Sequence, residues 1–295
     1  MCSTTSIRTA ASLIVCRLSA GSTPDFSVLL LKRSPHGAFG GLTVFPGGAI
    51  SPSDFDPLWT RSTSHSTIPS PISKVGSHLA IAALRETFEE SGVYITHNPP
   101  DSSILQDWRG RVYNDASQFR VMANQLNAYP ALSRLVYWAN WITPTTMPKR
   151  FDTHFFMTVV DQECGWGGRV AADGDETITA EWMTPTHALS LFEQKKITTL
   201  PPQFIMLKEL STMSFSQLKG MVDSAHTYLR PIEPILPEYI GKSGQGDVVM
   251  ALPGDERHST SSPGWTGKRR ITLVKENGLV TGLKLEESTT TGLKL

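Results

Sequence analysis

The sequence has few cysteines, no net charge and no long apolar run, and each shortage excludes a class of protein. Three cysteines in 295 residues (Cys2, Cys16 and Cys164) are too few and too scattered for a disulfide framework or a zinc site. We therefore expect reduced thiols and an intracellular protein. Lys plus Arg and Asp plus Glu both total 27, and no basic stripe is interleaved with aromatics, which argues against nucleic acid as a partner. No apolar run reaches the ~20 residues of a membrane span, and we expect no signal peptide in Met1 to Thr9.

One short segment, residues 82–93, carries most of the chemical information. It contains Glu86, Glu89 and Glu90 at spacings of three and four, which a helix would bring to one face. Clustered carboxylates repel one another unless a cation lies among them, and hard divalent cations such as Mg²⁺ take oxygen ligands. An acidic helix face exposed to solvent is the alternative interpretation.

The flanking residues support a helix at this position. Its opposite face is apolar, with Ile81, Leu84 and Phe88 available to pack against a core. Arg85 lies four residues before Glu89, a spacing at which the two side chains can pair.

Upstream residues extend this segment into a known motif. Phe45-Pro46-Gly47-Gly48 precedes it by some forty residues, and Asp54 follows Gly48 by six. Together they resemble the Nudix box, G-x5-E-x7-R-E-U-x-E-E-x-G-U, where U is aliphatic. The direct matches are Gly48, Arg85, Glu86, Glu89, Glu90, Gly92 and Val93. Asp54 stands where the pattern has Glu, and Thr87 where it has an aliphatic residue.

The spacing inside the box departs further from the pattern. Where the pattern has seven residues, this chain has 30, from Phe55 to Leu84 (84 − 55 + 1). The added residues include a Ser-, Thr- and Pro-rich stretch at 62–71, a composition typical of a loop. A surface loop lengthens at modest entropic cost, so the metal-binding half of the motif is unaffected. Whether Asp54 still lies beside the helix is left open by the sequence.

Five further strings resemble one branch of the Nudix superfamily, the peroxisomal acyl-coenzyme A diphosphatases, which also lengthens the first half of its box. These strings are Trp141-Ile142-Thr143-Pro144, Arg150-Phe151-Asp152-Thr153-His154-Phe155-Phe156, Glu181-Trp182-Met183-Thr184-Pro185, Leu200-Pro201-Pro202-Gln203-Phe204 and Leu252-Pro253-Gly254-Asp255. The resemblance covers roughly residues 7 to 275.

The resemblance implies metal-dependent hydrolysis of the pyrophosphate of coenzyme A or acyl-CoA, giving 3′,5′-ADP and (acyl-)4′-phosphopantetheine. It implies Mg²⁺ or Mn²⁺ on Glu86, Glu89 and Glu90, where divalent ions would neutralise phosphate charge and lower the pKa of an attacking water. Arg85 would hold the carboxylates in place. Gly47 and Gly48 would let the backbone approach the phosphates without a clashing Cβ.

The general base lies outside the box and is harder to choose. Asp173, Asp175, Glu176 and Glu181 lie on a segment leading into Trp182, and we choose Glu176. A solvated acidic turn is the alternative for each of them.

The extra phosphate of coenzyme A calls for basic residues. Lys32, Arg33, Lys149 and Arg150 are our candidates, because Arg in particular matches phosphate oxygens in a fork geometry. A surface-charge role for Lys32 and Arg33, and an ion pair between Arg150 and Asp152, are equally consistent with the sequence.

We expect an α/β (α+β) Nudix fold, a mixed β-sheet sandwiched between helices, with the domain at 7–230 and the insertion at 55–77. A β-rich C-terminal extension at 231–295 contains an Asn277-Gly278 hairpin signal. The predicted strands are 10–17, 26–32, 42–45, 93–96, 135–142 and 152–160. The predicted helices are 77–91 with Ser77 as N-cap, 106–126, 184–196 opened by Thr184-Pro185, and 214–224.

Two other functions fit the same residues. A Nudix diphosphatase could act instead on ADP-ribose, NADH or another nucleoside diphosphate derivative. A non-catalytic Nudix-fold module would bind a nucleotide or a protein, although loss of the box carboxylates would then be expected and all three are present. The partner is a small-molecule nucleotide in the enzyme readings, and the sequence predicts no oligomeric state.

The C-terminus offers the one candidate address. Leu293-Lys294-Leu295 resembles a peroxisomal S-K-L signal at its last two positions, with mitochondrion and cytosol as the alternatives. The same Thr-Gly-Leu-Lys-Leu string occurs at 281–285, so a duplicated edge-strand sequence explains it equally well. A fluorescent fusion imaged with and without the last three residues distinguishes these readings.

Overall fold

The computed structural model describes residues 6–35, 40–59, 70–160, 170–225, 232–276 and 279–288. Several sequence predictions therefore lie outside the described residues. These are the loop at 36–39, the Ser- and Thr-rich part of the insertion, Cys2, Cys164, the Asn277-Gly278 turn and the C-terminal Leu-Lys-Leu. Cys16 is described, and it is a buried free thiol.

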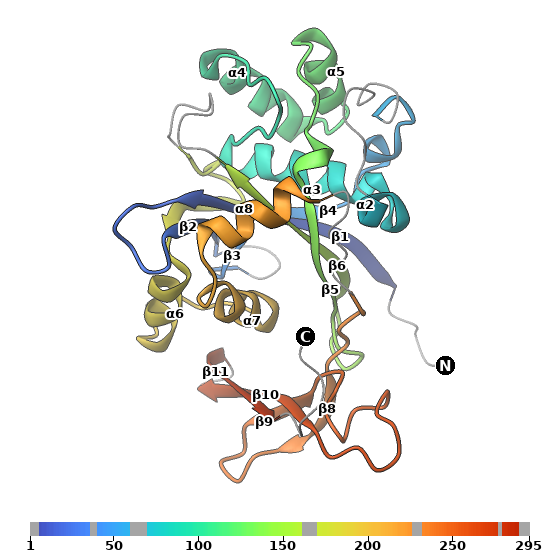
Figure 1. Ribbon diagram of the computed structural model, residues 1–295, viewed down its shortest axis with the longest axis vertical. Coiled ribbons are helices and arrows are strands. Elements are labelled where there is room, and N and C mark those ends of the chain that lie inside the picture. Colours follow the sequence, from blue (N-terminus) through green and yellow to red (C-terminus); the bar gives the residue numbers. More distant parts are fainter. Residues whose placement is uncertain are drawn as a thin grey trace.

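A mixed sheet forms the centre of the fold (Figure 1). Strand β1 (Ile7–Leu18) pairs in parallel with β6 (Arg150–Val160) and antiparallel with β2 (Phe26–Arg33). Among the described residues the sheet has seven strands in the order β3-β2-β1-β6-β5, with β4 paired to β1 and β7 to β2. The other strands are β3 (Thr43–Val44), β4 (Gly47–Ala49), β5 (Val136–Ile142) and β7 (Thr177–Met183). Both strands were expected, at 152–160 and 135–142; β6 lies inside the sheet, whereas β5 lies at the end of this order.

Alternation along β1 divides the interior into two apolar clusters. Ala11, Leu13 and Val15 join one cluster, and Ile14 and Cys16 join the other. Side chains of successive strand residues point to opposite faces, so both faces of β1 are covered. Residues of α2 (Ser70–Val75), α3 (Ser77–Ser91), α4 (Ser102–Asn114) and α5 (Gln118–Gln125) belong to the first cluster. Those of α6 (Pro185–Glu193), α7 (Pro201–Leu210) and α8 (Phe215–Asp223) belong to the second.

The sandwich of helices around a mixed sheet is thus confirmed. Short 3₁₀ helices, η1 (Pro52–Phe55) and η2 (Leu132–Arg134), complete the connections. Of the helices that the structure describes, none is both long enough and apolar enough to cross a membrane.

Most predicted helix ends are close to the observed ones. Gly92 ends α3 in the left-handed conformation at φ 77°, and its N–H donates to the Phe88 carbonyl. The Thr184 side chain caps α6 by accepting the N–H of His187, as predicted, although the helix ends at Glu193 rather than near 196. At the start of α3 the prediction was wrong: Gly76, not Ser77, is the N-cap residue, and it gives no side-chain hydrogen bond.

Two further predictions were wrong. Residues 93–96 do not form a strand; within the described chain their only bridge pairs Thr96 with Pro130. Their apolar side chains are buried instead in the first cluster, among residues of α2 to α5. There the hydroxyl of Tyr94 donates to the Ala128 carbonyl. The helix expected at 106–126 is two helices, separated where the Asp115 side chain accepts the N–H of Ser117. Such local side-chain bonds compete with helix continuation.

Helix α7 was not predicted at all. Pro201 and Pro202, which belong to one of the five family strings, occupy the first turn of α7. Proline is tolerated there because the first N–H groups of a helix have no partner within the helix.

The C-terminal residues form a separate four-stranded antiparallel sheet, at the bottom of the view in Figure 1. Its order is β11-β10-β9-β8, built from β8 (Glu238–Lys242), β9 (Val248–Ala251), β10 (Lys268–Glu276) and β11 (Leu279–Ser288). Met250, Leu252 and Ile271 belong to the second cluster, so the sheet packs against the main fold. Ile235, in the connection, exchanges backbone hydrogen bonds with Asn140 and Ile142 of β5.

Asp255 organises this C-terminal sheet. It is fully buried, and its carboxylate accepts two hydrogen bonds from Arg270, at 2.8 and 3.1 Å, and one each from the backbone N–H groups of Arg257 and Arg269. Burial by itself raises the pKa of Asp255, but these bonds outweigh it and bring the pKa below the ordinary 3.8.

We expect Asp255→Asn to lower the free energy of unfolding by about 3 kcal/mol, because breaking a buried charge pair is costly. The stabilisation by the ionised carboxylate is complete above pH 3.8 and is lost as the pH falls through the lowered pKa of the folded state. The difference between variant and wild type should therefore narrow in acid. Urea unfolding at neutral and acid pH measures both effects.

Asp223→Asn is the matched control. The Asp223 carboxylate pairs with Lys219 on the surface, and such pairs contribute at most about 1 kcal/mol. Equal losses in the two variants would contradict the role assigned to Asp255.

Candidate active site

The site is built where the two glycines of strand β4 meet the acidic face of α3. β4 pairs with β1, and this places Gly48 opposite Ala11 and Gly47 opposite Ser12. A Cβ on Gly48 would lie 2.4 Å from Glu86 Oε2, so the Glu86 carboxylate occupies the space that this glycine leaves. A Cβ on Gly47, whose φ is +154°, would instead meet the β1 backbone at 2.5 Å.

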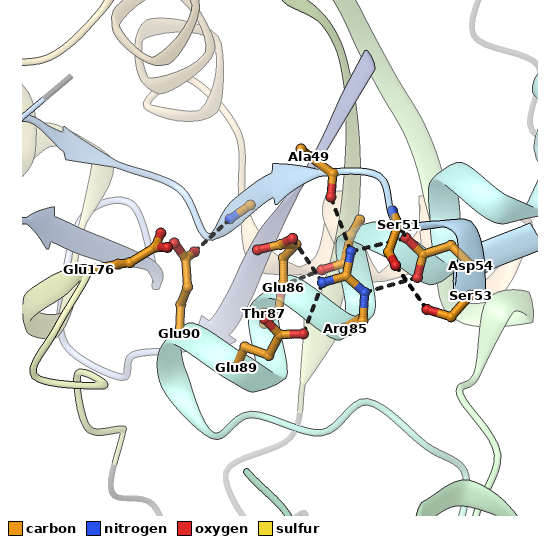
Figure 2. Close-up of polar contacts among 12 residues, drawn as sticks. Ala49, Ser51, Ser53, Asp54, Arg85, Glu86, Thr87, Glu89, Glu90 and Glu176 are labelled. Carbon is orange, nitrogen blue, oxygen red and sulfur yellow. Dashed lines mark hydrogen bonds and ion pairs between the residues drawn. The ribbon is translucent and has the colours of Figure 1, made fainter. Parts of the chain in front are cut away.

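Arg85 joins three carboxylates (Figure 2). Its Nε and Nη2 donate to the two oxygens of Asp54 at 2.9 and 3.0 Å. Its Nη1 donates to Glu86 at 2.9 Å and to Glu89 at 2.8 Å, which confirms the predicted pairing at i,i+4. Nη2 also donates to the carbonyl of Ala49. The Arg85 side chain is only 3% exposed, so these are buried, charge-assisted contacts.

Asp54 therefore lies beside the helix, which the sequence left open. As a shorter residue than the Glu of the pattern, it still accepts both bonds of the Arg85 fork, and its other contact is the N–H of Ser51. Thr87, the second departure, is fully buried and donates its hydroxyl to the Ala83 carbonyl at 2.7 Å. It fills an aliphatic position without leaving an unpaired polar group.

Glu90 faces the other way along the helix, away from Arg85 (Figure 2). Its Oε2 accepts the backbone N–H of Gly47 at 2.8 Å, and its Oε1 forms an ion pair with Arg33 Nη1 at 3.4 Å. Arg33 Nη2 also contacts Glu176 Oε2 at 3.2 Å, so Arg33 lies between the two carboxylates.

The acidic side chains lie in a low-dielectric environment. Burial raises the pKa of Glu89 to about 7, and the charge of Glu86 acts in the same direction against the opposing effect of Arg85. Burial also raises the pKa of Glu90 well above its usual range, with Glu86 adding to the effect and the Gly47 N–H opposing it. For Glu86 burial again raises the pKa and Arg85 lowers it. Ionising all three together therefore requires added positive charge.

The donor set fits a hard divalent cation, because it consists of carboxylate oxygens on one helix face. It is not arranged as a finished cage: no group of metal-ligating side chains in the described parts of the chain already converges on one point. Glu86 and Glu89 point toward Arg85, and Glu90 points toward Gly47 and Arg33. The identity of the ion does not follow from this geometry.

Of the four acids considered as a general base, Glu176 has the most suitable position. Its side chain is 56% exposed and lies next to Glu90 (Figure 2). Asp173 is engaged within its own loop, accepting from Thr177 and from the N–H of Asp175. Asp175 accepts the hydroxyl of Tyr113. Glu181 lies five residues further along, exposed on β7.

The four basic candidates differ in position, and Lys149 is exposed immediately before β6. Arg33 is in the site, whereas Lys32, its neighbour on β2, is exposed and has no ion pair among the residues described. Successive strand side chains point to opposite faces, which separates the two. Arg150 begins β6, and its Nε donates to the carbonyl of Thr143. The structure does not bring Lys32 or Arg150 to the carboxylates, nor does it pair Arg150 with Asp152 in the chain described.

Two supporting residues were missed from the sequence. Arg109 of α4 donates from Nε to the carbonyl of Glu89 at 2.8 Å, near the end of α3, where cations are favoured. The hydroxyl oxygen of Thr177 of β7 lies 3.4 Å from the carbonyl oxygen of Glu90, while its shorter hydrogen bond, at 2.8 Å, is donated to Asp173. Neither contact has a sequence signal, because each joins residues far apart along the chain.

A mixed sheet between helices, with a glycine-containing strand set against an R-E-x-x-E-E helix, defines the Nudix hydrolase class. Similar solved structures agree: a NUDIX hydrolase from Alicyclobacillus acidocaldarius superposes with a TM-score of 0.61 at 25% identity, covering 75% of this chain and 97% of that one.

Sequence comparison narrows the class to one family. The NUDT19 Nudix domain model matches residues 60–210. The acyl-coenzyme A diphosphatase NUDT19 of Xenopus laevis is 31% identical over 89% of this chain and 78% of its own length. A putative nudix hydrolase 7 of Caenorhabditis elegans is 30% identical over 85% and 75%, respectively. The chain belongs to the NUDT19 family of Nudix hydrolases.

The two glycines allow a direct test of the site geometry. We expect Gly48→Ala to displace the flexible Glu86 side chain, weaken Mn²⁺ binding about tenfold and leave the melting temperature near that of wild type. Gly47→Ala should instead lower stability by about 1–3 kcal/mol, because its Cβ meets backbone. Calorimetric titration and thermal unfolding separate the effects. Unchanged Mn²⁺ affinity in Gly48→Ala would show that Glu86 is not a ligand.

Proposed function

We propose that the protein hydrolyses the pyrophosphate of coenzyme A or acyl-CoA, giving 3′,5′-ADP and (acyl-)4′-phosphopantetheine. The carrying observation is the set of carboxylates on one face of α3: Arg85 holds Glu86 and Glu89, and the N–H of Gly47 on β4 holds Glu90. The substrate is supported by relatives named acyl-coenzyme A diphosphatase, at 26–31% identity over most of the chain.

The cation in this proposal is Mg²⁺ or Mn²⁺, held by Glu86, Glu89 and Glu90. When bound, a divalent ion neutralises phosphate charge and lowers the pKa of an attacking water. Arg85 keeps Glu86 and Glu89 at fixed positions, because its Nη1 contacts both. The Gly47 N–H orients Glu90 through Oε2.

Glu176 is the proposed general base. Glu176 is open to solvent and adjacent to Glu90. A water molecule can therefore lie between the Glu176 carboxylate and a substrate phosphate and contact the two groups. Deprotonating that water as it attacks phosphorus would avoid building a positive charge on the nucleophile. The P–O bond to the leaving phosphate then breaks, and each product carries one phosphate of the original pair.

The competing substrates are ADP-ribose, NADH and other nucleoside diphosphate derivatives, which carry the same reacting group. Incubating the protein with CoA, an acyl-CoA, NADH and ADP-ribose in the presence of Mg²⁺ or Mn²⁺, followed by product mass, separates them. We expect the CoA species to be cleaved fastest, with 3′,5′-ADP as the common product. Faster cleavage of ADP-ribose or NADH would reject the proposed substrate.

The same assay tests the carboxylates. We expect Glu90→Gln to lower turnover by at least the roughly 100-fold that loss of supporting groups around a metal produces. The variant should keep the wild-type melting temperature, because an amide oxygen still accepts the Gly47 N–H. Glu193→Gln, an exposed position at the end of α6, serves as the control. Full activity in Glu90→Gln would refute the metal-binding role.

A further inference from the structure

Glu90 differs from the other two box glutamates in how its oxygens are used. Glu86 and Glu89 each give only Oε1 to Arg85, and within the described chain no bond occupies their Oε2 atoms. Both oxygens of Glu90 are engaged, Oε2 by the Gly47 N–H and Oε1 by Arg33. A cation that takes Oε1 of Glu90 must therefore displace Arg33 or share the oxygen with it.

The two arginines of the site are held with different strength. Arg85 is 3% exposed and contacts its carboxylates at 2.8–3.0 Å. Arg33 lies at the end of β2, its side chain is 22% exposed, and its contacts are longer, at 3.4 Å to Glu90 and 3.2 Å to Glu176. Long, partly solvated ion pairs contribute little, so Arg33 can be released where Arg85 cannot.

We propose that Arg33 is a positioning residue that holds Glu90 in the absence of the cation and is released toward the substrate diphosphate when the cation binds. The guanidinium and the cation are both positive and both use Glu90 Oε1, so they compete for it. A released guanidinium beside Glu90 and Glu176 is close to where the proposed reaction occurs, and its fork matches phosphate oxygens.

This inference rests on the proposed function for the identity of the diphosphate, and it adds an order of events. Before the cation binds, Arg33 is occupied and the carboxylates repel an anionic substrate. After it binds, the local negative charge is reduced and a phosphate-binding arginine becomes available. Cation binding therefore comes first, and the diphosphate follows.

The test is a calorimetric titration with Mn²⁺ and no substrate. We expect Arg33→Met to bind Mn²⁺ about two- to fivefold more tightly than wild type, because a competing ion pair of modest strength is removed. Arg33→Lys keeps a competing charge and should bind nearly as wild type does. Lys32→Met is the matched control, since it removes one positive charge at the adjacent, exposed position and should leave Mn²⁺ affinity unchanged.

If Arg33 instead supported the metal site, Arg33→Met would bind Mn²⁺ more weakly than wild type, because losing a residue that orients a ligand weakens metal binding. Equal or weaker Mn²⁺ binding by Arg33→Met would therefore overturn the proposal, as would an equal gain in Lys32→Met. Thermal unfolding of each variant confirms that the titrated protein is folded.

The second measurement concerns release toward the substrate. At saturating Mn²⁺, Arg33→Met should raise KM for CoA about tenfold, the loss expected when a phosphate-binding fork is removed, with a smaller change in kcat. An unchanged KM would overturn that half of the proposal. If wild type does not cleave CoA, the proposed function fails, whereas the Mn²⁺ titration still tests the competition at Glu90.

Discussion

The contact on which the site depends is the fork of Arg85. Through it, one guanidinium ties η1 (Asp54), β4 (the Ala49 carbonyl) and α3 (Glu86 and Glu89) into a single unit. Burying so many charges without a partner would be prohibitive, so the arginine and the acids stabilise each other only as a group. This environment also favours the protonated form of Arg85. Burial alone would lower the pKa of Arg85, but the bond to Asp54 and the nearby carboxylates raise it above its ordinary value.

The protein has no net charge, yet its charges are unevenly distributed. Asp54, Glu86, Glu89, Glu90 and Glu176 surround only two arginines in direct contact, Arg85 and Arg33, among the described residues. The excess of carboxylate explains why burial and mutual repulsion raise the pKa values of the box glutamates. It also explains how a neutral protein can attract a cation and then a polyanion to one place, since the local field rather than the net charge acts at this range.

How far the sequence predicts this structure depends on the range of the interaction. The bounds of the α3 helix and its Arg85–Glu89 pair depend on neighbouring residues, and both were predicted. The Asp54–Arg85 bond crosses the insertion and could not be predicted, because nothing in the composition of a loop fixes where its ends meet. The strand prediction for residues 93–96 was wrong for a related reason. Their β-branched and aromatic side chains indicate burial, but the tertiary fold decides whether that burial occurs in a sheet or beneath helices. Lys32 and Arg33 are adjacent basic residues that the sequence does not distinguish, and only the fold brings Arg33 to the carboxylates.

The bridge at Ile235 has a consequence of a different kind. Strand β5 is the last in its sheet order, and a terminal strand presents unpaired N–H and C=O groups that another chain could use. Ile235 accepts the N–H of Ile142 and donates its own N–H to the carbonyl of Asn140, which covers that part of the edge. The segment that leads to the C-terminal sheet thereby protects the main sheet against edge-to-edge association. A shorter connection that bypassed β5 would leave the C-terminal sheet intact and expose the main sheet to aggregation.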